Sequence, residues 1–152
     1  GTLVVHAPER LWEPPPLDVE VNARFDDAVT LLGAILRPAT CDLSPATPLT
    51  VTLVWRAEAE METSYRIFLH LLGPDGSIVA QSDGEPANWT RPTTGWLPGE
   101  IVLDERVLTV PEGVPEGDYL LQAGVYIFGH GRLTTTQGED AVPLCWLRMG
   151  AP

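Results

Sequence analysis

The chain has 152 residues, a formal net charge of −12 and only nine basic residues. This balance argues against nucleic acid as a partner, because a phosphate backbone is bound through clusters of Lys and Arg. It also argues against docking on anionic lipid. Hydrophobic residues at 44% exclude a disordered chain, and the length suits one domain with a genuine core.

Fifteen prolines and fourteen glycines are typical of short strands joined by tight turns. No apolar run approaches the roughly twenty residues that span a bilayer, so no membrane insertion is expected of this chain. Gly1–Val5 lacks the basic start of a signal peptide. Because the chain begins with Gly1 and no Met, we expect an excised fragment, which leaves the location of its parent protein open.

The chain is expected to form a single domain, 1–152, with a peripheral N-terminal part. Residues 1–7 are predicted as an edge strand and residues 13–16 as a proline-rich connector, so residues 1–18 precede a sandwich core over 19–149. The first core strands are predicted over 19–25, where apolar and polar residues alternate, and over 29–37.

Residues 50–57 are a clear strand, with Val51, Leu53 and Trp55 on one face. The strongest hairpin signal spans residues 65–83, around the turn Pro74-Asp75-Gly76. Its first half is apolar on both faces, as a central strand is. We expect Trp55, Ile67, Leu69, Leu121 and Val125 to belong to the core.

Residues 84–99 are predicted as a long loop, and residues 101–110 as a strand whose apolar residues change phase midway. A β-bulge near Arg106 would account for this change. Residues 119–127 form a strong strand, entered through Gly117-Asp118-Tyr119. This entry resembles the tyrosine corner of Greek-key sandwiches, in which the phenol bonds to the preceding connection.

Short strands over 132–136 and 144–149 complete the pattern, and residues 58–64 are too short for a helix. About nine strands without crossover helices predict an all-β fold with negligible helix. The expected architecture is an antiparallel β-sandwich of Ig-like or jelly-roll-like type.

Cys41 and Cys145 are either a disulfide or two free, buried thiols, and the sequence leaves the choice open. The chain has no CxxC motif and no Cys/His cluster. The spacing of its aspartates matches no calcium loop. We therefore predict no metal and no cofactor.

Seven segments of the chain share a recognisable order and spacing: Leu31–Gly33, Leu53–Ala57, Phe68–Leu72, Pro74–Gly76, Val79–Asp83, Pro92–Glu100 and Pro115–Tyr119. Together they resemble a recurring bacterial β-sandwich module over roughly residues 19–128. That module resembles the extracytoplasmic end of multi-span membrane proteins, many of them similar to dolichyl-phosphate-mannose-type glycosyltransferases. The resemblance implies an extracytoplasmic location, tethered to the membrane through a parent protein, and it implies no catalytic residues.

The 84–99 loop carries the first candidate site for a ligand. Trp89 and Arg91 lie close in sequence to Asp83 and Glu85. An exposed Trp could stack on the apolar face of a sugar while carboxylates accept its hydroxyls. Trp89 is as compatible with closing the end of the core, and for Trp96 that structural role is favoured.

His70, Gln81 and Asp83 form the second candidate group, because neighbouring hairpin strands bring their side chains together. A His–Asp pair can perform acid–base chemistry. No Ser or Cys sits in a recognisable nucleophile elbow, so a structural hydrogen bond is the favoured interpretation.

Three functions follow from these patterns. The first is a non-catalytic accessory module whose partner is a glycan or another domain of its parent protein. The second is a purely structural protein-interaction domain. The third is a hydrolase that uses His70 and Asp83.

Overall fold

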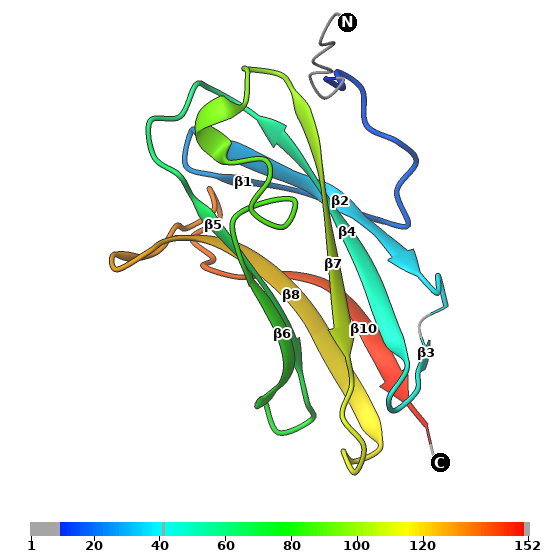
Figure 1. The fold of residues 1–152 in the computed structure, drawn as a ribbon. Helices are drawn as coiled ribbons and strands as arrows, with labels where there is room; N and C mark the ends of the chain where they lie inside the picture. The colour runs from blue at the N-terminus through cyan, green and yellow to red at the C-terminus, as the bar shows by residue number, and fades with distance from the viewer. Residues whose placement is uncertain (1–9, 41, 151–152) are drawn as a thin grey trace, which may run out of the picture.

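The computed structural model describes residues 10–40 and 42–150 (Figure 1). The predicted edge strand at 1–7 and Cys41, one half of the candidate disulfide, lie outside the described residues. The described part contains ten strands and a short 3₁₀ turn, η1 (Thr93–Gly95). The strands are β1 (Val19–Phe25), β2 (Val29–Arg37), β3 (Asp42–Leu43), β4 (Pro48–Ala57), β5 (Arg66–Leu72), β6 (Ile78–Gly84), β7 (Ile101–Thr109), β8 (Gly117–Ile127), β9 (Gly131–Arg132) and β10 (Val142–Met149).

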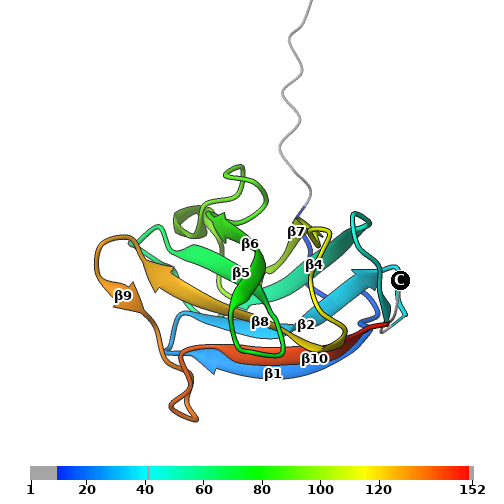
Figure 2. The same ribbon diagram turned by 90° about the horizontal axis from the view of Figure 1, so that it is seen from below.

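The strands form two packed sheets, which confirms the predicted all-β sandwich. One sheet has the order β1-β2-β4-β7, and the other has the order β3-β10-β8-β5-β6 with β9 added to β8. Neighbouring strands are antiparallel except for the short β3–β10 pair, which is parallel. Edge strand β6 lies beside β7 on one side of the sandwich, and β1 lies beside β10 on the other (Figure 2).

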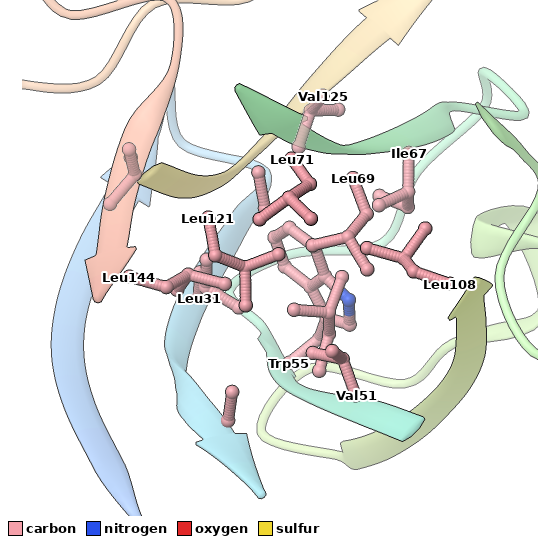
Figure 3. Packing of buried hydrophobic residues seen from close by; sticks show 14 of the residues in the cluster. Leu31, Val51, Trp55, Ile67, Leu69, Leu71, Leu108, Leu121, Val125 and Leu144 are labelled. Atoms are coloured by element: carbon pink, nitrogen blue, oxygen red, sulfur yellow. The ribbon is translucent and has the colours of Figure 1, made fainter. Parts of the chain in front are cut away.

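The core lies between the sheets, as the alternation predicts. Trp55, Ile67, Leu69, Leu121 and Val125 are each at most 1% exposed, so the predicted core is confirmed. Figure 3 shows Trp55 of β4 directed toward Leu69 and Leu71 of β5 in the opposite sheet. Trp96 is also buried, which confirms its predicted structural role.

The predicted hairpin and the predicted tyrosine corner are both present. The β5–β6 turn places Gly76 at φ 85°, a conformation that glycine adopts without steric cost. Tyr119 is fully buried, and its hydroxyl donates a hydrogen bond to the carbonyl of Pro115 at 2.5 Å. The phenol therefore ties β8 to the connection that precedes it.

The predicted β-bulge near Arg106 is wrong. Strand β7 pairs with β4 residue for residue over its whole length. The apolar pattern changes phase for another reason: Asp104 and Arg106 point inward as a buried pair, while Leu103 and Val107 face outward at 38% and 53% exposure. A buried ion pair has the hydropathy of a solvent-facing one, so alternation alone misplaces it.

The strand predicted over 132–136 is also shorter than expected. Strand β9 covers only Gly131–Arg132, and Thr135 then forms an isolated bridge with Phe25. Residues 58–64 contain no helix, as expected. Within the described residues, no helix has the length and apolar character needed to cross a membrane.

Candidate functional site

The edge strands β6 and β7 frame a groove of about 460 Å³ on one side of the sandwich. We call it the Trp89 groove. Its walls combine one aromatic ring, several oxygen acceptors and two outward-facing aliphatic side chains. These are Trp89, then Asp83, Glu85, Glu105 and Asn88, and then Leu103 and Val107.

Trp89 projects into solvent from a strained turn. Its side chain is 51% exposed. Ala87, Asn88 and Trp89 have φ angles of 53°, 54° and 69°, so three consecutive non-glycine residues occupy the left-handed region. A bulky residue rarely adopts this conformation, and it persists only where surrounding contacts enforce it. Strain of this kind concentrates at functional sites.

Two hydrogen bonds hold the turn in place. Asp104, which is fully buried, accepts a hydrogen bond from the Ala87 N–H at 2.8 Å. The Thr90 hydroxyl donates to the Ala87 carbonyl at 2.6 Å. Because both contacts converge on Ala87, the backbone of the turn is fixed from the interior and from the loop.

The indole of Trp89 packs closely over Gly84. A Cβ atom at Gly84 would lie 3.0 Å from Cζ2 of the Trp89 ring, and the φ of Gly84 is 146°. A side chain at this position would push against the ring and strain the backbone. Gly84 therefore sets how close the indole lies to the end of β6.

Arg106 joins the two sheets beneath the groove. Its Nε–H donates to Asp104 Oδ2 at 2.9 Å, its Nη1 donates to the Ser82 carbonyl at 2.9 Å, and its Nη2 donates to the Gly84 carbonyl at 3.0 Å. The guanidinium is thus bonded to β7 and to β6 at the same time. The floor of the groove is pre-organised by these buried bonds.

Asp83, Glu85 and Trp89 come together in the groove, as the loop pattern suggested. Arg91 does not line it. The Arg91 guanidinium bonds to the buried Glu100 at 2.6 Å, and the Arg91 carbonyl accepts the Trp96 Nε1–H at 3.0 Å. Arg91 therefore fastens the loop over Trp96.

His70 and Gln81 lie opposite each other on β5 and β6, outside the groove. His70 is 6% exposed, and its Nε2 lies 3.3 Å from Asp83 Oδ1. His70 and Asp83 line a shallow depression of about 230 Å³, together with Phe68, Tyr126 and Arg132. Asp83 is the residue that both hollows share.

Burial lowers the pKa of His70 below its ordinary value, because the interior disfavours the charged imidazolium. The carboxylate of Asp83 acts in the opposite direction, and the charge of Arg132 reinforces the lowering. His70 is therefore neutral at pH 7. The residues lining the depression include no Ser, Thr or Cys, and the hydroxyl group among them belongs to Tyr126.

Several residues around the groove had no recognisable signal of their own in the sequence. Asn88, Leu103, Glu105 and Val107 line it. For Leu103 and Val107, the only signal in the sequence is the change of phase within residues 101–110. This change indicates that some apolar side chains of the strand face outward. Arg66, which lies over the Trp89 ring, and Phe128, whose ring Arg66 also contacts, come from distant segments.

No family model matches this chain, and no curated protein matches it in sequence. Among solved structures, the crystal structure of the C-terminal domain of Wzt has a similar fold. The TM-score is 0.57 at 14% sequence identity, and the match covers 96% of this chain and 81% of the Wzt domain. At this identity the similarity concerns the fold.

Proposed function

We propose that this chain is a non-catalytic module that binds a glycan in the Trp89 groove. The observation that supports this most is the half-exposed Trp89, held in a strained conformation at a groove lined with carboxylates. Sugar recognition needs a flat aromatic surface for the C–H face of the ring and fixed acceptors for its hydroxyls. The groove offers both on a rigid base.

The acceptors come from both sheets of the sandwich. Asp83 and Glu85 belong to β6 and the residue after it, whereas Glu105 belongs to β7. A sugar seated against Trp89 would therefore meet oxygen acceptors from both sheets. The outward-facing Leu103 and Val107 add apolar surface along the β7 wall.

The wider context of the proposal comes from the resemblance in sequence. We place the module on the extracytoplasmic side, tethered through a parent protein similar to a membrane glycosyltransferase. Its partner there would be the glycan that the parent handles or another domain of that parent. The close pairing of the buried His70 with Asp83, in a hollow whose lining contains no Ser, Thr or Cys, supports a structural role for that pair.

A protein-interaction domain is the second candidate, and one specific feature favours it. An apolar row crosses the outer face of the larger sheet from β10 to β6: Trp146, Leu120, Leu72 and Ile78 are consecutive cross-strand partners. Trp146 and Ile78 at its ends are 62% and 48% exposed. Such a surface is suited to a neighbouring domain of the parent.

The test is a titration with mannose- and glucose-based oligosaccharides, followed by amide chemical shifts and Trp fluorescence. One stacked Trp with a few hydroxyl contacts predicts binding near millimolar, about −4 kcal/mol. Shifts should be confined to β6, β7 and residues 84–91. Trp89→Ala should abolish them, and Trp146→Ala, which removes another exposed Trp from a different face, should leave them unchanged.

Two outcomes would contradict the proposal. If no sugar perturbs Trp89 at tens of millimolar, the interaction domain becomes the better interpretation. If an oligosaccharide is hydrolysed and Asp83→Asn or Glu105→Gln abolishes the hydrolysis, the groove is an active site.

A further inference from the structure

Arg66 is held between two exposed aromatic rings at the edge of the Trp89 groove. Its Cζ lies 4.9 Å from the centroid of the Trp89 ring and 4.1 Å from that of the Phe128 ring. Trp89 and Phe128 are 51% and 68% exposed. Because the two rings contact the guanidinium through cation–π interactions, they restrict its orientation.

The charge environment of Arg66 is unusual for this protein. All nine basic residues of the chain are arginines, against 21 acidic residues. Among the described residues, every other arginine forms an ion pair with a carboxylate. Arg66 has neither an ion pair nor a side-chain hydrogen bond within the described part of the chain, so its N–H donors are available to a ligand.

We propose that Arg66 binds an anionic substituent of the glycan, a carboxylate or a phosphate, while the adjoining sugar stacks on Trp89. This inference rests on the proposed function and adds the class of ligand. A guanidinium stacked on aromatic rings keeps its planar fork of donors at the edge, and that fork matches the two oxygens of a carboxylate or phosphate.

The groove also sets the direction in which such a ligand would bind. Asp83, Glu85 and Glu105 accept hydroxyl groups but repel an anion, so the neutral sugar belongs in the groove. Its anionic substituent then points out of the groove, past Trp89, toward Arg66. The ligand is thus a sugar chain with negative charge on one side.

A simpler role for Arg66 would be to position the Trp89 ring. The two roles predict different results for Arg66→Met, which keeps an apolar stem between the rings but removes the charge. Arg132→Met is the matched control: Arg132 also stacks on an aromatic ring, with Cζ 4.2 Å from the Phe68 centroid, but it is paired with Asp140 at 3.6 Å.

The experiment compares three gluco-oligosaccharides of equal length: one neutral, one with a terminal glucuronate and one with a terminal 6-phosphate. Wild type should bind at least one charged member about tenfold more tightly than the neutral one at low salt. The preference should fall as salt is added. Arg66→Met should remove the preference for the charged oligosaccharide and keep the affinity for the neutral one. Arg66→Lys should retain part of the preference, and Arg132→Met should leave it intact.

The outcomes separate this inference from the proposed function. Preference for only one of the two charged sugars supports the inference and identifies the anion. Equal binding of all three sugars by wild type overturns the inference and leaves glycan binding in place. Loss of neutral-sugar binding in Arg66→Met, with fold confirmed by thermal unfolding, overturns it in favour of a positioning role. Failure of wild type to bind any of the sugars overturns both.

Discussion

Arg106 and Asp104 lie two residues apart on β7, both point into the sandwich, and together they connect its two sheets at the Trp89 groove. Asp104 divides its oxygens between the Arg106 Nε–H and the Ala87 N–H. Arg106 uses its remaining donors on the Ser82 and Gly84 carbonyls of β6. A buried pair of this kind adds little net stability compared with apolar residues, but removing one partner is costly.

We expect Asp104→Ala to lower the free energy of unfolding by about 3 kcal/mol, because it leaves the buried Arg106 charge without its counter-ion and the Ala87 N–H without its acceptor. Urea unfolding measures this loss. Glu105→Ala is the control, since Glu105 is exposed on the same strand and should change stability by less than about 0.5 kcal/mol. Equal losses in the two variants would contradict the role assigned to the pair.

Tyr119→Phe should destabilise the protein by about 1 kcal/mol, the usual value of one intramolecular hydrogen bond. The substitution keeps the buried ring and removes only the bond from the hydroxyl to the Pro115 carbonyl. Equilibrium unfolding of Tyr119→Phe against Tyr126→Phe provides the comparison, because the Tyr126 hydroxyl makes no hydrogen bond within the described residues. A loss confined to Tyr126→Phe would show that the corner contributes nothing.

Leu69→Ala and Leu121→Ala should each cost about 2–5 kcal/mol, through lost burial and the cavity that remains. Both side chains are fully buried between the sheets and lie within one cluster. Thermal or urea unfolding gives the values. Losses below about 0.5 kcal/mol at both positions would show that these faces of β5 and β8 do not carry the core.

Much of the fold could be predicted because burial follows chain periodicity. Period-2 alternation predicts β1, β4 and β8 and places Trp55 and Leu121 inside. The hairpin also predicted that Asp83 would approach His70, because the two residues occupy neighbouring strands close in register. Local pattern and turn chemistry are therefore sufficient to predict which residues of a strand are buried and which residues of one hairpin lie close together.

The rest of the site depends on contacts that no local pattern encodes. Arg66, Trp89 and Phe128 belong to three separate segments and meet only when the sheets are assembled. The β-bulge predicted near Arg106 is absent because hydropathy treats a buried, paired guanidinium as a solvent-facing one, and so the inward-facing parity of β7 is misread. Proximity in sequence groups Arg91 with Trp89, but the folded loop brings the Arg91 guanidinium to Glu100 instead.

The last prediction concerns His70 and the dependence of stability on pH. Burial lowers the pKa of His70 from its ordinary value of 6.5; Asp83, on β6, opposes this shift, and Arg132, on β9, adds to it. Below pH 6.5 the unfolded chain therefore binds a proton that the folded protein resists. Keeping His70 neutral therefore makes a contribution to the free energy of unfolding that is fully present above pH 6.5 and is lost as the pH falls toward the folded-state pKa.

Urea unfolding of wild type should accordingly show a free energy of unfolding that decreases between about pH 7.5 and pH 5, a window above the titration of ordinary carboxylates. His70→Gln should flatten this slope, since it keeps a hydrogen-bond donor for Asp83 but cannot titrate. His130→Gln, which changes an exposed histidine, should reproduce the wild-type slope. If His70→Gln and wild type have the same slope, or if wild type gains stability as the pH falls, the imidazole is not held neutral by the fold.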